Sequence, residues 1–343
     1  MFGTFRFCLA SLVMVGHLSG FPPFSYYGMY AVFGFYVVSG YLMTAILRET
    51  YGFSTKGSLR FWANRLLRLF PAYYCVALLS LGLVLAFPGQ AARFHDAFST
   101  HVRALDVLGN SFLFPYPFYR QRFRLVPPSW SLGVELSCYV VLWLFTARSV
   151  ACSAVSFGLA CGYAMYTAGV GLDWSSRYYP VRAAILPFSI GSLLFFYRVP
   201  VKRALAGRLG LALAVTAAAL VINLVVAFVP TRYAHSAGFY VNLGLMACLV
   251  AELASLDPLT DAVRRVDGML GKLSYPVFLV HWSVAFAVTL LWEFARKRSL
   301  TLLAVSYPLV IACAVLLVRY LDEPVQHLRT TIRTRHDAQA AER

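Results

Sequence analysis

Two ionisable side chains, Arg6 and His17, lie in the first long apolar stretch of the chain. Eleven helical steps of about 100° bring both onto one stripe of a helix, with a rise of about 16 Å between them. Histidine can act as a general base near neutral pH, and arginine can hold a phosphate or carboxylate, so both are candidate catalytic residues. A hydrogen bond between helices for His17 and a purely membrane-orienting charge for Arg6 remain alternatives.

A group of basic residues follows in the segment Arg60-FWAN-Arg65-LL-Arg68. Arg60, Asn64 and Arg68 are successive i,i+4 neighbours, so one helical face would present a basic fork toward the cytosol. Such a face suits the phosphates of a nucleotide-containing donor. Arg65 and Arg68, together with Arg6, are therefore candidate donor-binding residues. Contact with lipid phosphate alone is the alternative.

Polar residues also open a later apolar stretch, in Trp130-Ser131-LGV-Glu135. Glu135 lies one helical turn after Ser131, and we expect both a few ångströms below the outer surface. A carboxylate there can accept a hydrogen bond from a sugar hydroxyl or hold a protonated histidine, which makes Glu135 a candidate catalytic residue. Trp130 and Ser131 are candidates for substrate binding. A structural salt bridge from Glu135 to Arg177 or Arg182 is the competing explanation.

A second histidine lies in an apolar stretch near the end of the chain, in Tyr275-PVFLV-His281. On a helix, His281 lies about 9 Å along the axis from Tyr275. Ionisable groups at membrane depth are costly, which makes each of them a candidate for function. We take Tyr275 and His281 as candidates for substrate binding, and a link between helices is the alternative for His281.

The amino-acid composition indicates that these residues belong to a membrane protein. Of 343 residues, 60% are hydrophobic and 13% are charged, about half the charged fraction of an average soluble domain. The net charge is +16, and the charged residues lie in short clusters between long apolar runs. This pattern is typical of loop charges that orient a protein in the bilayer, and it argues against a nucleic-acid-binding protein. The seven cysteines are scattered without a disulfide or zinc pattern, so no metal site is expected.

We therefore predict an all-α polytopic membrane protein with about ten spanning helices. The first span lacks a cleavage signal and is expected to be a retained helix. Lysine and arginine number nineteen on one side and eleven on the other, which predicts that both termini are cytoplasmic. The ten expected spans are 5–19, 30–47, 70–87, 130–145, 150–168, 182–197, 209–229, 236–256, 275–294 and 299–318.

Residues 1–325 are expected to form one transmembrane domain, with an extracytoplasmic loop at 88–128 and a polar cytoplasmic tail at 326–343. The loop contains His95, His101, an aromatic run at 112–119 and the basic residues Arg120, Arg122 and Arg124. These side chains would line a groove for a sugar or a lipid headgroup, or form an interfacial belt of aromatic and basic residues.

Taken in order, these segments resemble the acyltransferase 3 family of bacterial integral-membrane acyltransferases, over essentially the whole chain. The resemblance implies transfer of an acyl group, usually acetyl from acetyl-CoA, to a carbohydrate hydroxyl at the inner membrane. Acceptors in the family include lipopolysaccharide O-antigen, capsule, exopolysaccharide and lipo-oligosaccharide signals. The matching motifs are Arg6 with His17, Phe35-YVVSGYL, Arg65-xx-Arg68 before Pro71-AY, Trp130-SLxx-Glu135, Tyr275-PxxLx-His281 and Asp322-Glu323-Pro324.

Two features depart from the family pattern. Phe33 replaces an acidic residue that many members carry, which leaves the role of that carboxylate absent or moved, for example to Glu135. The sequence also lacks the esterase-like domain of longer members, so we expect the bundle and the 88–128 loop to deliver the acceptor.

The resulting hypothesis places the phosphates of acetyl-CoA on Arg65, Arg68 and Arg6, with the thioester carried toward His17 through a tunnel open to both compartments. His17 would act as a base or carry the acyl group, while Glu135 and His281 would bind or orient the acceptor. The main alternative is a transporter or flippase of a glycolipid, and a structural membrane subunit is a third reading. The acceptor and the oligomeric state stay open.

Overall fold

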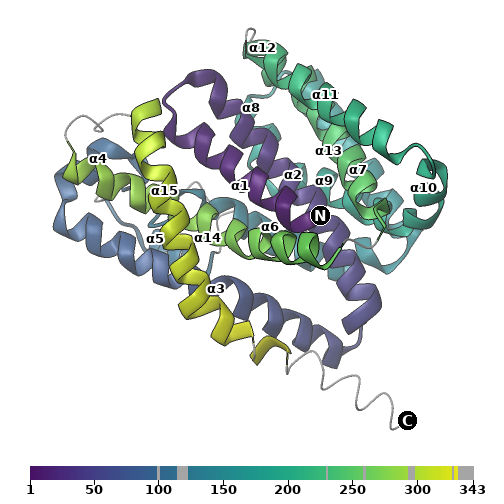
Figure 1. Ribbon diagram of the computed structural model, residues 1–343, viewed down its shortest axis with the longest axis horizontal. Helices are drawn as coiled ribbons and strands as arrows, with labels where there is room; N and C mark the ends of the chain where they lie inside the picture. Colours follow the sequence, from purple (N-terminus) through teal and green to yellow (C-terminus); the bar gives the residue numbers. More distant parts are fainter. Residues whose placement is uncertain are drawn as a thin grey trace.

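The computed structural model describes residues 1–98, 101–113, 123–228, 231–257, 260–292, 298–326 and 328–330, and this part of the chain is helical without any strand (Figure 1). The α-helices are α1 Phe2–Leu18, α2 Pro22–Ile46, α3 Thr55–Ala86, α4 Pro88–Phe94, α5 Ala104–Phe112, α6 Trp130–Leu144, α7 Val150–Gly169, α8 Trp174–Tyr178, α9 Val181–Phe196, α10 Arg198–Leu205, α11 Leu209–Ala227, α12 Thr231–Ala234, α13 Ala237–Ser255, α14 Asp261–Leu291 and α15 Leu300–Leu317.

Eight of the helices are long and apolar enough to cross a membrane, which confirms the prediction of an all-α polytopic protein. Each of the ten expected spans is helical, but α1 has only 17 residues and α6 only 15. At 1.5 Å per residue, α6 extends about 22 Å, which is shorter than a hydrocarbon core of about 30 Å. The chain enters the bundle before α6 begins, because the preceding 3-10 turn Pro127–Ser129 is itself buried.

The bundle has a central group of helices and a lipid-facing rim. In the most apolar 18-residue stretch of each span, 72% of the residues are buried in the span of α2 and 78% in α14, but only 11% in α11. In Figure 1, α1 and α2 run beside α14 in the middle, with α10 and α11 at one edge and α4 and α5 at the other. Large apolar side chains such as Leu159 and Leu211 are exposed on the rim, as expected for a surface that faces lipid.

Helices α1 and α14 run parallel and in register. The amide of Gly3 donates to the carboxylate of Asp267 (3.1 Å), and His17 meets His281 fourteen residues further along both helices (2.9 Å). Asp267 also accepts from the amide and hydroxyl of Thr4, so it caps the start of α1. This packing places His17 on the stripe of α1 that faces α14.

Arg6 lies on the same stripe. A Cβ on Gly271 of α14 would lie 2.9 Å from the Gly3 Cα and 3.2 Å from an Arg6 Nη, so the glycine pair permits the close approach of the two helices there. The expected shared stripe of Arg6 and His17 is therefore confirmed.

The 88–128 segment packs onto the bundle through α4, α5 and short 3-10 turns. The Asn110 amide donates to the carbonyls of Asp106 and Phe123 and accepts from the Leu125 amide, so it joins α5 to residues 123–125. Most of the aromatic run, together with Arg120 and Arg122, lies at 114–122, outside the described residues. The tail is described only to residue 330, where a helical segment continues the chain after the π-helical turn Val318–Asp322.

Candidate active site

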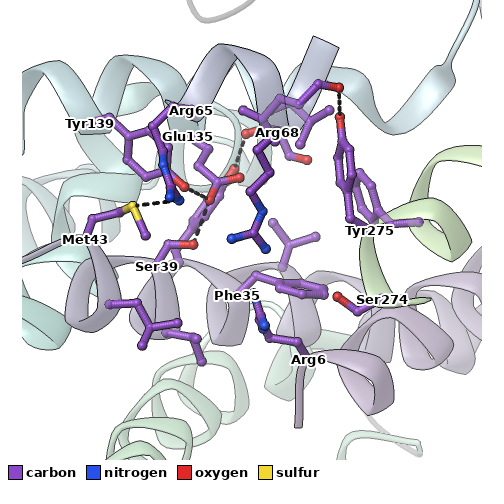
Figure 2. A pocket seen from close by; sticks show the side chains of 18 residues that line it. Arg6, Phe35, Ser39, Met43, Arg65, Arg68, Glu135, Tyr139, Ser274 and Tyr275 are labelled. Atoms are coloured by element: carbon purple, nitrogen blue, oxygen red, sulfur yellow. Dashed lines mark hydrogen bonds between the residues drawn. The ribbon is translucent and has the colours of Figure 1, made fainter. Parts of the chain in front are cut away.

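Five helices surround a cavity with about 790 Å³ of space not filled by atoms, part of it open solvent (Figure 2). Both ends of the chain contribute to it, since α1 and α14 form one wall. Its polar side chains include all three of the arginines expected to bind the donor. These polar side chains are Arg6 of α1, Tyr36 and Ser39 of α2, Arg65 and Arg68 of α3, Ser131, Glu135 and Tyr139 of α6, and Ser274 and Tyr275 of α14.

The arginines of α3 point into the bundle. Figure 2 shows the Arg68 guanidinium in the middle of the cavity, with Arg6 approaching from the opposite wall. Arg65 is 5% exposed and donates to the Met43 sulfur (3.4 Å) and the Asn64 Oδ1 (3.2 Å), while its Nε is buried without a hydrogen-bond partner. The expectation that this face opens to the cytosol is therefore wrong for Arg65, because α3 turns that side chain toward α2.

Glu135 faces the same cavity as the arginines. One carboxylate oxygen accepts hydrogen bonds from the Ser39 hydroxyl (2.7 Å) and from the Tyr139 hydroxyl. Helix α6 begins at a turn that is already buried, so Glu135 lies inside the bundle and lines the same cavity as Arg68. Its expected distance of a few ångströms from the outer surface stays a prediction. The competing salt bridge is not the arrangement found, since Arg177 and Arg182 lie over the rings of Trp174 and Tyr163.

Ser39 reaches Glu135 because α2 packs tightly on α9. A Cβ on Gly40 would lie 2.3 Å from the Phe188 carbonyl oxygen, and one on Gly191 would lie 2.1 Å from the Val37 oxygen. The pair of glycines thus lets the two backbones touch and fixes the rotation of α2. The serine and glycine of the Phe35-YVVSGYL motif therefore have separate physical roles.

The two membrane histidines form a hydrogen-bonded pair. His281 is fully buried, with Nδ1 3.2 Å from the Val277 carbonyl and Nε2 2.9 Å from Nδ1 of His17. A carbonyl only accepts, so in a neutral pair Nδ1 of His281 carries hydrogen and its Nε2 accepts from His17 Nδ1–H. His17, which is half-buried, is left with an unprotonated Nε2. The pair can therefore present a base.

Trp282, His95 and Arg298 surround the histidine pair. The ring centroid of Trp282 lies 5.4 Å from that of His17 and 4.3 Å from that of His95, and Arg298 stacks on Trp282 (4.8 Å). Burial, with the charges of Arg298 and Arg124, lowers the pKa of His95 to about 3. His95 Nδ1 accepts from the Ala97 amide (2.9 Å), so the neutral ring donates through Nε2.

An aromatic side chain separates the cavity from the histidine pair. Phe278 lines the cavity beside Phe35, and its ring centroid is 6.3 Å from those of both Phe35 and His281. His17 is not among the residues that line this cavity, so the cavity itself does not reach the histidine pair. The structure thus places two chemical centres on either side of one phenyl ring.

Of the remaining residues predicted to bind substrate, two line the cavity and one lies outside it. Ser131 and Tyr275 line the cavity, and Tyr275 donates to the Leu69 carbonyl (2.8 Å). Trp130 is the first residue of α6 and lies outside the cavity, with its ring centroid 4.7 Å from that of Tyr179.

With this geometry in place, comparison with known proteins decides the family. The sequence model described as an acyltransferase domain matches residues 3–319, nearly the whole chain. The chain belongs to the acyltransferase 3 family. Membership favours an enzyme over the transporter that the sequence left open. Within the described residues of this acyltransferase, no cluster of three or more metal-ligating side chains is found.

One curated relative carries a name that describes an activity. The acyltransferase is 27% identical to the Bacillus subtilis (strain 168) protein "Putative peptidoglycan O-acetyltransferase YrhL" over 190 residues, or 51% of the chain. The match covers 30% of that relative, so the two proteins correspond over a minor part of its length. No solved structure matches the acyltransferase significantly.

Several residues of the site were missed by the sequence reasoning. Tyr139 looks like an ordinary core aromatic, and Asp267 lies in a polar stretch before the apolar part of α14. Arg298 comes from a separate loop, so only the folded chain brings it to Trp282 beside His95, which the sequence had placed in the 88–128 loop. Ser39 lay in the Phe35-YVVSGYL motif, but the sequence assigned it no role.

Proposed function

We propose that this acyltransferase transfers an acetyl group from acetyl-CoA to a hydroxyl of an envelope carbohydrate, and that it acts in the inner membrane of a bacterium. The observation that carries the proposal is the convergence of Arg6, Arg65 and Arg68 on one cavity. Glu135 is the one carboxylate among the described residues that line it, and it is engaged by Ser39 and Tyr139. The excess of guanidinium groups suits a donor with several phosphates.

The imidazole pair supplies the base for the transfer. The free Nε2 of His17 takes the proton of the acceptor hydroxyl as the oxygen attacks the thioester carbonyl. The tetrahedral intermediate collapses with loss of the CoA thiolate, and His17 returns the proton to the sulfur. The products are the O-acetyl ester and CoA. His95, through its Nε2–H, or the Arg298 guanidinium stabilises the developing oxyanion in this scheme, because both pack on Trp282, whose ring lies beside His17.

The cavity residues have donor-side roles in this scheme. Glu135, placed beside Arg68, balances charge and holds Ser39 and Tyr139 in position. Ser131 and Tyr275 line the path of the pantetheine arm. Phe33 packs between Tyr178 and Phe239 in the core, so the carboxylate of other members has no counterpart at that position.

The acceptor is a carbohydrate hydroxyl that approaches on the His17 side. The relative named for peptidoglycan adds the sugars of the cell wall to the acceptors implied by the family, which are O-antigen, capsule, exopolysaccharide and lipo-oligosaccharide. All of these acceptors present secondary or primary hydroxyls to a base, so His17 would serve each of them in the same way.

The test uses membranes that contain wild-type protein or the His17→Ala variant, with acetyl-CoA labelled in the acetyl group and a glycan acceptor. Wild type should move label into the glycan, and mass spectrometry of envelope glycans should show one added acetyl unit. His17→Ala should lower transfer by about 10²–10⁴-fold. The matched control is His235→Ala, which changes a histidine that packs on Trp174 outside the described site and should leave transfer at the wild-type level. Full activity of a folded His17→Ala protein would remove His17 from catalysis.

A further inference from the structure

A second cavity adjoins the first at Arg65. It holds about 470 Å³ of space not filled by atoms, part of it open solvent, and lies between the π-helical turn Leu47–Tyr51, α3 and the segment after Asp322. Arg65 lines both cavities, so they meet at this side chain.

One amide oxygen in this second cavity holds two guanidinium groups. Asn64 Oδ1 accepts from Arg65 Nη2 (3.2 Å) and from both Nε and Nη2 of Arg329 (3.3 Å each). Among the described residues, neither arginine forms an ion pair with a carboxylate. Two like charges are therefore held beside each other, an arrangement that an anion would stabilise.

The surroundings favour an anion over a plain anchor for the tail. Asn64 Nδ2 also donates to the Arg329 carbonyl (3.3 Å), so the backbone contact alone would hold the tail. Thr50 and Tyr51 line the same space and belong to a π-helical turn, and such turns are frequent at functional sites. The buried Arg65 Nε has no hydrogen-bond partner.

We propose that this second cavity binds the 3′-phosphorylated adenosine end of acyl-CoA, with Arg329 on the 3′-phosphate and Arg65 on the diphosphate. The diphosphate then lies where the two cavities meet, within reach of the arginines of the first cavity, and the pantetheine arm continues into that cavity. The inference rests on the proposed function for its choice of ligand. Arg329 is far from the other site residues in sequence, and no motif of the chain pointed to it.

The first test compares two donors. Arg329→Gln should raise the KM for acetyl-CoA about tenfold or more, leave kcat within about twofold, and leave the KM for S-acetylpantetheine unchanged, because that donor has no nucleotide. Arg208→Gln, an exposed arginine outside the cavity, should change neither constant. An unchanged KM for acetyl-CoA, or an equal rise for both donors, would overturn the proposal.

A second variant separates ligand binding from anchoring of the tail. Asn64→Asp places a carboxylate between the two arginines, so it should hold the tail at least as well while competing with a bound phosphate. Affinity for CoA and for adenosine 3′,5′-bisphosphate, measured by calorimetry, should fall about tenfold while the Tm stays at or above that of wild type. Unchanged nucleotide affinity in this variant would leave Arg329 as an anchor and overturn the proposal.

The binding measurements also separate this inference from the proposed function. Nucleotide binding that depends on Arg329, without any acetyl transfer, would support the site and refute the enzyme activity. Acetyl transfer that adenosine 3′,5′-bisphosphate does not inhibit would do the reverse. Nanodiscs of phosphatidylcholine, with or without phosphatidylglycerol, test the lipid source of phosphate. If Arg329→Gln lowers only phosphatidylglycerol binding, the cavity holds a lipid headgroup and the nucleotide proposal is wrong.

Discussion

A membrane histidine can serve as a base only if its accessible nitrogen carries the lone pair. Here a backbone carbonyl determines which ring nitrogens of the histidine pair are protonated. The Val277 carbonyl accepts a hydrogen bond from His281 Nδ1–H, so Nε2 of His281 is unprotonated and accepts a hydrogen bond from His17. In the proposed reaction, His281 therefore acts through His17 and is a positioning residue. The sequence left open whether it orients reacting groups or links helices. The hydrogen bond to His17 links α1 to α14, and the orienting role stays a prediction.

This role can be tested at His281 itself. His281→Gln keeps an amide oxygen that can accept from His17, whereas His281→Leu offers no acceptor. We expect His281→Leu to lower kcat by about 10²–10⁴-fold with an unchanged KM for acetyl-CoA, because the arginine cavity lies beyond Phe278. His281→Gln should recover part of the loss. Equal kcat in both variants and wild type, measured on folded protein, would show that the ring only fills space.

At the scale of elements, two close helix contacts set the site. Gly3 with Gly271 brings α1 onto α14, and Gly40 with Gly191 brings α2 onto α9. Small residues at such contacts are the usual means of helix packing in membranes. The first contact aligns Arg6 and His17 along α14, and the second turns Ser39 toward Glu135.

The α2–α9 contact predicts a cost for one added methyl group. Gly40→Ala would place a Cβ 2.3 Å from the Phe188 oxygen, so the helices must separate. We expect a loss of about 1–3 kcal/mol, only partly offset by the better helix propensity of alanine, and a lower Tm in detergent. Gly158→Ala on the exposed face of α7, where no atom lies within 4 Å, is the matched control and should not lower the Tm. An unchanged Tm for Gly40→Ala would show that this contact can relax.

At the scale of the whole molecule, the sequence predicted those features that depend on local composition, namely the positions of the helices and the side chains that share a helix face. Apolar length located all ten helical segments, and helical periodicity placed Arg6 and His17 on one stripe. The depth of Glu135 could not be read this way, because it depends on how far the chain enters the bundle before α6 begins. The same holds for His95 and Arg329, which reach their sites only through the packing of segments distant in sequence.

At the scale of the whole molecule, Phe278 both lines the arginine cavity and packs near His281, and this predicts how substitutions at Phe278 divide the reaction. In the proposed reaction, a thioester that starts on the arginine side passes this ring to meet His17. Phe278→Trp should therefore lower kcat roughly tenfold or more without weakening CoA binding, because the phosphates stay on the near side. Phe278→Ala should raise hydrolysis of acetyl-CoA in the absence of acceptor, because water gains the same passage.

Phe286→Ala provides the matched control for this last prediction. Phe286 is a buried phenylalanine of the same helix that packs on Phe94 and Phe98, away from the cavity. Its loss should lower the Tm, as a core truncation does, without changing the ratio of hydrolysis to transfer. Steady-state assays with labelled acetyl-CoA, with and without glycan, measure both rates. If Phe278→Trp transfers acetyl at the wild-type rate, the donor reaches His17 by another route, and the arginine cavity is not on its path.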